Sequence, residues 1–205
     1  ATKSGIAPID IFKVGLVTSP LTLLLAVKVS ISKSSTLMSN GLFRFTAFDF
    51  SDGQGDDNVF LCNHDATSAA KWRMYDGINV VGYQLVDNVF ETATWVHIVA
   101  IVDGTTMKIY KNGVLADTES NGQEPPSLTR VQHWIGRSPW STHSYFDGTI
   151  AYLRFWHGTA LNANQVQQMY LNRESKINII DNNIFFISPT AIRPRLEIDV
   201  VQPHH

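Results

Sequence analysis

Residues 95–113 contain two short apolar runs, each of which ends at a dipeptide that favours a tight turn. The first run begins at Trp95 and ends at Asp103-Gly104, and the second ends at Asn112-Gly113. Asp-Gly and Asn-Gly suit the tight turns that join antiparallel strands, because these residues tolerate the positive φ that such turns require. The region therefore predicts a β-hairpin, and a chain built around a hairpin of this kind is expected to be rich in strands.

The same combination of short strands and turns recurs along the chain. One face of the strand expected over residues 21–31 carries Leu21, Leu23, Leu25, Val27, Val29 and Ile31. Shorter runs with one apolar face surround three further residues, Phe45, Trp72 and Leu153. Turn dipeptides separate the runs at Asn40-Gly41, Asp52-Gly53, Asp76-Gly77 and Asp147-Gly148. Many short strands with regular turns predict an all-β sandwich. Residues 161–172, where Asn162 can cap an apolar stripe of helical spacing, predict one short helix in the C-terminal half.

Charge and hydropathy exclude two classes of partner. The chain has 16 basic and 18 acidic side chains, a net charge of -2, and no block of Lys and Arg. Such a chain has no field that would collect phosphate groups, so nucleic acid is not an expected partner. The longest apolar stretch near the N-terminus, residues 14–27, is interrupted by Pro20 and is too short for a helix that crosses a bilayer. We therefore expect no membrane insertion.

Length and cysteine content indicate one domain without a disulfide framework. A β-sandwich of 205 residues commonly stays undivided, so we expect a single domain over residues 1–203. His204 and His205 indicate the remnant of a purification tag, and a start at Ala1 indicates a mature chain or a fragment. Cys62 is the only cysteine, so no disulfide can form within the chain.

Three further-reaching motifs occur in the chain. Residues 95–113 have a Trp-x-His start and a Tyr-x-Asn-Gly end, residues 135–156 contain Ile-Gly-Arg and Phe-Asp-Gly-Thr-Ile, and residues 48–59 form an acidic Gly-containing segment. In order and spacing, these three stretches resemble laminin G-like domains of the concanavalin A-like lectin/glucanase superfamily. The resemblance is strongest over residues 42–171. It implies a two-sheet antiparallel jelly-roll sandwich that binds its ligand by rim loops or by a sheet face, and it implies a scaffold role for His97. The superfamily includes lectins, glycan-cleaving enzymes and protein-binding adhesion modules, so fold alone does not choose among them.

Residues 197–202 are similar to the catalytic Glu-x-Asp-x-x-Glu strand of the laminarinase and lichenase branch of that superfamily. Gln202 stands where the second Glu, the general acid, is required, and an amide cannot deliver that proton. The alternation of Ile198 and Val200 is enough to predict an ordinary strand here. The sequence also lacks a nucleophile elbow and a His-x-x-x-His zinc spacing, so we expect no catalytic residues.

Four aspartates crowd one Gly-containing segment: Asp49, Asp52, Asp56 and Asp57. Carboxylate oxygens at this density could hold Ca²⁺, with help from Asn58 or from backbone carbonyl groups. The alternative is a solvated turn, because the pattern of an EF-hand is missing. Calcium is the only cofactor that the sequence suggests.

Two sets of side chains suit sugar binding, which needs aromatic faces for C–H surfaces and planar polar groups for hydroxyls. The first set lies in loop 137–145 and consists of Arg137, Trp140, His143 and Tyr145. A Trp in a loop, without a core role, predicts an exposed recognition residue. The second set is expected on the non-core face of the strands and consists of Arg44, Arg73, Tyr75, Tyr152, Arg154 and Trp156. Packing beneath the expected helix is the alternative explanation for this second set.

These observations predict a non-catalytic carbohydrate-binding (lectin-like) or adhesion module whose partner is a glycan, a glycoprotein or a protein. A glycan-cleaving enzyme of the same superfamily and a protein-interaction module of the laminin G type are the alternatives. The resemblance to this family implies an extracellular, cell-surface or virion-surface location.

Overall fold

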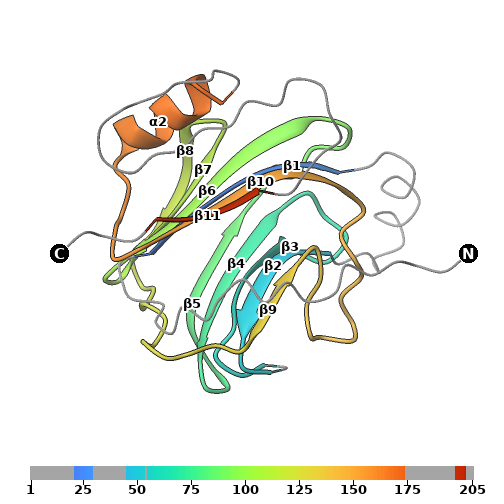
Figure 1. Cartoon of the computed structure of the whole chain (residues 1–205), viewed down its shortest axis with the longest axis vertical. Coiled ribbons are helices and arrows are strands. Elements are labelled where there is room, and N and C mark those ends of the chain that lie inside the picture. The colour runs from blue at the N-terminus through green and yellow to red at the C-terminus, as the bar shows by residue number, and fades with distance from the viewer. Residues whose placement is uncertain (1–20, 30–44, 54, 174–196, 202–205) are drawn as a thin grey trace, which may run out of the picture.

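A computed structural model of the chain describes residues 21–29, 45–53, 55–173 and 197–201. These residues form two β-sheets packed face to face, and one helix lies against the outside of the larger sheet (Figure 1). The strand order is β11-β10-β1-β6-β7-β8 in the six-stranded sheet and β5-β4-β3-β2-β9 in the five-stranded sheet. The expected all-β jelly-roll sandwich is confirmed.

The strands of the six-stranded sheet are β1 (Leu21–Val29), β6 (Trp95–Asp103), β7 (Thr106–Lys111), β8 (Val114–Glu119), β10 (Gly148–His157) and β11 (Glu197–Val201). Those of the five-stranded sheet are β2 (Thr46–Ser51), β3 (Val59–Asn63), β4 (Ala70–Asp76), β5 (Asn79–Val86) and β9 (Gln132–Ile135). Among the described strands, neighbours pair antiparallel with one exception, the parallel pair β10 and β11. The predicted hairpin over residues 95–113 is confirmed as β6 and β7.

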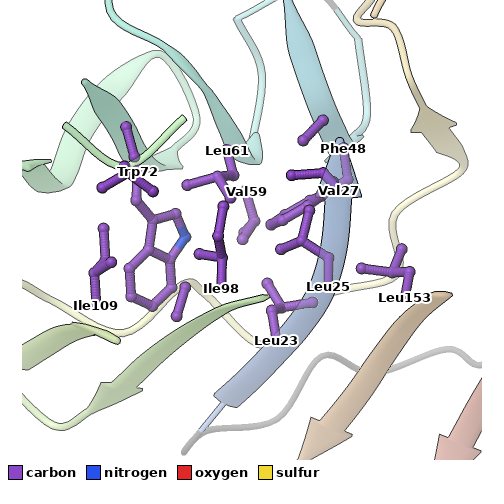
Figure 2. Close-up of a cluster of buried hydrophobic side chains, with 14 of the residues drawn as sticks. Leu23, Leu25, Val27, Phe48, Val59, Leu61, Trp72, Ile98, Ile109 and Leu153 are labelled. Carbon is purple, nitrogen blue, oxygen red and sulfur yellow. The ribbon is translucent and has the colours of Figure 1, made fainter. Parts of the chain in front are cut away.

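The main core lies between the two sheets. Leu23 and Leu25 of β1 are buried on the inner face, where Leu61 of β3 and Trp72 of β4 approach from the other sheet (Figure 2). Burying one such side chain stabilises the fold by about 1.5–3 kcal/mol relative to leaving it exposed. The period of two that the sequence shows in residues 21–27 is therefore the pattern of a strand with one face in this core.

A smaller core lies on the opposite face of the six-stranded sheet, under helix α2 (Ala163–Leu171). Val166 and Met169 of the helix are buried there with Leu24 of β1 and Trp156 of β10. Asn162 caps the helix, since its side chain accepts a hydrogen bond from the Gln165 backbone N–H at 3.0 Å. The predicted helix and its cap are confirmed. Within the described residues, no helix is long and apolar enough to cross a membrane.

Candidate ligand-binding face

The five-stranded sheet has one face in the core and one face turned away from it, and we call the second the outer face. Residues that are register partners on neighbouring strands share a face of the sheet. The register therefore places one row across all five strands of the outer face, formed by Trp134 (β9), Asp49 (β2), Phe60 (β3), Arg73 (β4) and Tyr83 (β5). Two of the sequence-predicted residues, Asp49 and Arg73, are thus on one surface.

The loop of residues 136–147, which follows β9, is held against β2. The Gly136 backbone N–H donates to the Ala47 carbonyl at 2.9 Å. The Ser138 hydroxyl donates to a carboxyl oxygen of Asp49 at 2.6 Å, within a buried environment. Farther along the loop, the His143 Nδ1 and the Thr46 hydroxyl are 2.8 Å apart. The anchored loop brings the first predicted sugar-binding set to the outer face.

Trp140 packs into this arrangement instead of standing free. It is half-buried, and a Cβ added to Gly55 would come within 2.8 Å of the indole. The indole also stacks on His143, with ring centroids 6.1 Å apart and planes at 24°. The sequence predicted an exposed indole at this loop position. That expectation is wrong, because the indole packs against Gly55 in the turn between β2 and β3.

The Arg137 guanidinium is close to two aromatic rings, one of them in β9. Its guanidinium carbon is 4.0 Å from the centroid of a Trp134 ring and 5.2 Å from that of Tyr145. Tyr145 is 54% exposed, whereas Trp134 and Arg137 are half-buried. Arg137 and Tyr145 were predicted from the sequence, whereas Trp134 was missed. The sequence contained a signal for Trp134, which directly precedes Ile135 in a short strand. Because side chains alternate along a strand, Trp134 lies on the face away from the core when Ile135 packs against the core.

A second arginine on the outer face has a similar environment. The Arg73 guanidinium carbon lies 5.1 Å from the Tyr83 ring centroid and 5.9 Å from that of Tyr75, and its Nη1 donates to the Tyr75 hydroxyl at 3.1 Å. Tyr75 is buried, with its ring stacked near Phe60. Tyr83 is 39% exposed on the edge strand β5 and was missed, although it alternates with the buried Gln84 and Val86. The structure therefore keeps Arg73 and Tyr75 together and adds Tyr83.

Asp49 lies in the row between Trp134 and Phe60 and is fully buried. Its two carboxyl oxygens accept hydrogen bonds from the Ser138 hydroxyl at 2.6 Å and from the Asn58 side-chain amide at 2.7 Å. Burial raises the pKa of the carboxyl from 3.8 to about 7, while the two hydrogen bonds act in the opposite direction. This carboxyl fastens the loop to the sheet.

The other three aspartates belong to the turn between β2 and β3. The Val131 backbone N–H donates to the Asp52 carboxylate at 3.0 Å, the Gly77 backbone N–H donates to the Asp57 carboxylate at 2.7 Å, and Asp56 is exposed. Within the described part of the chain, no three His, Cys, Asp or Glu side chains gather as metal ligands. The four aspartates therefore do not form the single ligand set that their spacing suggested, because Asp49 is engaged under the loop. Calcium binding by this turn stays a prediction.

The second predicted set is divided between two opposite surfaces. Arg154 and Trp156 belong to β10 in the six-stranded sheet, not to the outer face that carries Arg73 and Tyr75. Trp156 is only 5% exposed, because helix α2 covers it, and Arg154 lies half-buried over the Tyr152 ring at 5.1 Å. The prediction of one shared face is wrong, since alternation along a strand does not reveal which sheet the strand joins. Arg44, the remaining member, lies outside the described residues.

The segment that resembles a catalytic strand forms β11 at the edge of the six-stranded sheet. Glu197 and Asp199 occupy register positions beside Tyr152 and Arg154 of β10. They are therefore on the sheet that lies away from the outer face. The strand predicted here is confirmed.

Residues 28–167 match a family model described as the concanavalin A-like lectin/glucanases superfamily. The chain belongs to this superfamily. No curated protein sequence matches the chain.

Solved structures that share the fold of this superfamily member include proteins of several kinds. The native heptameric SAP-like pentraxin of Limulus polyphemus superposes with a TM-score of 0.53 at 14% identity, covering 78% of this chain and 73% of the pentraxin. The CBM40 of the Ruminococcus gnavus IT-sialidase, bound to alpha2,3 sialyllactose, has a TM-score of 0.53 at 10% identity, with 74% and 82% covered. The botulinum neurotoxin serotype D binding domain has a TM-score of 0.52 at 14% identity, with 77% of this chain and 38% of that chain covered. At these identities the likeness concerns the fold.

Proposed function

We propose that the chain is a non-catalytic carbohydrate-binding module whose ligand lies on the outer face, against the anchored loop 136–147. The observation that carries this proposal is the exposed ring of Tyr145, which lies beside the Arg137 guanidinium on a loop fixed by hydrogen bonds to β2. An aromatic ring without a place in the core offers a flat apolar surface. A guanidinium beside it offers planar N–H donors.

This pairing suits a pyranose ring, whose C–H face is apolar and whose rim carries hydroxyl groups. The anchoring of the loop matters as much as the residue types. Because Ser138 and His143 hold the loop to β2, the rings do not have to be ordered at the moment of binding. Less conformational entropy is then lost on association.

The comparisons are consistent with a binding role. The CBM40 structure carries a sugar ligand, and the neurotoxin structure is a binding domain. Both share the fold of this chain at low identity, so they support the class of function and not the position of the site. An extracellular, cell-surface or virion-surface setting fits a module of this class and stays a prediction.

The proposal assigns no catalysis to the outer face. Hydrolysis of a glycosidic bond on the usual plan needs two carboxyl groups that flank it. Of the strand residues that the structure describes on this face, Asp49 is the only acid, and both of its oxygens accept hydrogen bonds from the protein. A glycan-cleaving enzyme is therefore the weaker candidate, and release of reducing sugar from β-glucans would be the result that revives it.

The test is a glycan array probed with the wild-type chain and with Tyr145→Ala. We expect the substitution to lower the affinity for every bound glycan by about tenfold, because removing one aromatic ring from the interface costs on the order of 1–2 kcal/mol. We expect no change in melting temperature, since Tyr145 is 54% exposed. Trp95→Ala is the matched control, because Trp95 is a comparably exposed aromatic residue, 47% exposed, on the six-stranded sheet.

Unchanged binding by Tyr145→Ala would place the ligand elsewhere on the sandwich. An array without any bound glycan, together with capture of a defined protein by the same chain, would favour the protein-interaction alternative. Equal reductions for Tyr145→Ala and Trp95→Ala would indicate a non-specific effect of removing surface aromatic residues.

A further inference from the structure

The two arginines of the outer face share an unusual lack of acidic partners. Within the described residues, Arg137 has no hydrogen bond or ion pair and is held only by the rings of Trp134 and Tyr145. Arg73 has one hydrogen bond, to the Tyr75 hydroxyl, and its Nε is buried without a partner in that part of the chain. Both side chains are half-buried, so their charges are partly removed from water without being neutralised by the protein.

The other acidic and basic strand residues of this face, Asp49 and Lys71, do not neutralise them. The carboxyl of Asp49 is buried beneath the loop and accepts hydrogen bonds from Ser138 and Asn58. Lys71, which the register also places on the outer face of β4, adds a further cation. Although the whole chain has a net charge of -2, the described strands of this face therefore carry an excess of positive charge.

Stacking determines which ligand chemistry suits such an arginine. A guanidinium that lies over an aromatic ring has a face covered and keeps its N–H donors at its edge, in one plane. That edge matches a carboxylate or a sulfate group, which can accept two parallel hydrogen bonds. In a partly dehydrated site the attraction between the two charges is also stronger than in bulk water.

We propose that the ligand of the outer face is an acidic glycan, whose carboxylate or sulfate group is bound by the stacked guanidinium of Arg137, with Arg73 as a second cationic contact. The inference rests on the proposed function, because it names the class of sugar that the same face binds. A neutral hydroxyl group would leave the charge of Arg137 uncompensated. The acidic group is therefore what distinguishes ligands from non-ligands.

The experiment compares acidic glycans with the neutral glycans from which they are built. The whole chain is applied to a glycan array that includes acidic glycans with their neutral parents, among them sialyllactose, sulfated lactose and lactose. We expect the bound glycans to carry a carboxylate or a sulfate and their neutral parents to bind at least about tenfold more weakly, since a hydrogen bond between charged groups is roughly twice as strong as a neutral one. The carboxylated and sulfated probes show which acid is preferred.

Substitution of the arginines gives the second measurement. We expect Arg137→Gln to weaken binding of the acidic probes by about ten- to hundredfold and Arg73→Gln to weaken it less, because a neutral amide donates weaker hydrogen bonds to an acid than a guanidinium does. Arg173→Gln is the matched control, since Arg173 also stacks on an aromatic ring, that of Tyr170 at 4.1 Å, but follows helix α2 on the other sheet. The control should retain wild-type affinity.

The outcomes separate the two proposals. Equal binding of acidic glycans and their neutral parents would overturn the acidic ligand while leaving carbohydrate binding intact. Selective binding of acidic glycans that Arg137→Gln leaves unchanged would show that another group recognises the acid, and it would also overturn the assignment to Arg137. An array without any bound glycan would contradict the proposed function and this inference with it.

Discussion

The buried carboxyl of Asp49 makes the stability of the fold depend on pH. Its pKa is raised from 3.8 to about 7, so between these values the folded protein holds a proton that the unfolded chain releases. The stability that this proton contributes is complete below pH 3.8 and is lost as the pH rises through 7. Wild type loses this stability between pH 5 and pH 8, whereas Asp49→Asn does not. The free energy of unfolding of the variant, measured relative to wild type, should therefore rise by about 2 kcal/mol between pH 5 and pH 8. Denaturant titrations at both pH values measure it.

A second buried group, His97, changes stability in the opposite direction. Burial, assisted by the nearby charges of Arg173 and Arg154, lowers the pKa of His97 from 6.5 to about 4. The stability that comes from its lowered pKa is complete above pH 6.5 and is lost as the pH falls through 4. The wild-type curve combines both effects, so the difference between wild type and Asp49→Asn is the informative quantity, because His97 is common to both proteins. A difference that stays constant from pH 5 to pH 8 would contradict the raised pKa of Asp49.

At the scale of elements, helix α2 depends on the cap that the sequence predicted. Asn162 and Gln165 exchange hydrogen bonds with each other's backbone N–H groups, at 2.9 and 3.0 Å. We expect Asn162→Ala to lower the free energy of unfolding by about 1 kcal/mol, because the Gln165 backbone N–H loses its acceptor. Asn164→Ala, at an exposed position inside the same helix, is the control and should have little effect. Equal destabilisation of the two variants in thermal melts would contradict the capping role.

The strands and the helix could be predicted because their signals are local. Alternation identified the strand of residues 21–29 and the apolar face that it turns to the main core, and the Asn162 cap marked the start of the helix. Alternation did not predict that the other face of this strand is also buried, under helix α2. The division of the strands between two sheets was not predictable in this way, since a period of two identifies the faces of one strand but not its neighbours. Trp156 illustrates this limit of the sequence pattern. Like Arg73 and Tyr75, it alternates with core residues along its strand, yet it belongs to the other sheet and is buried there by helix α2.

The candidate site was predictable to the same extent. Arg137 and Tyr145 were identifiable because they lie in a loop among small polar residues. The burial of Trp140 was not predictable, since it depends on Gly55, which lies 85 residues earlier in the chain and becomes a neighbour only through the tertiary fold. Local patterns therefore identify polar and aromatic loop residues better than they predict which of these residues the tertiary fold buries.

At the scale of the whole molecule, the turn between β2 and β3 and the loop 136–147 form one unit. The hydrogen bond between Ser138 and Asp49 joins positions 89 residues apart, and the Trp140 indole covers Gly55 in the turn. The acidic turn therefore supports the loop that carries Arg137 and Tyr145. Changing the turn should consequently alter ligand binding, although no residue of the turn is proposed to contact the ligand.

Gly55→Ala tests this coupling. Gly55 has a positive φ of +74°, and its new Cβ would lie 2.8 Å from the Trp140 indole. Gly77→Ala is the matched control, because Gly77 also has a positive φ, +54°, but has no neighbouring atom within 4 Å of the added Cβ.

Both variants should be destabilised by about 1–2 kcal/mol in unfolding free energy, because alanine is strained in the left-handed backbone conformation. Only Gly55→Ala should also displace Trp140 and weaken glycan binding, with about tenfold lower affinity for each 1.4 kcal/mol by which the binding free energy falls. Equal glycan affinities of the two variants would show that the loop keeps its binding geometry without the support of the turn.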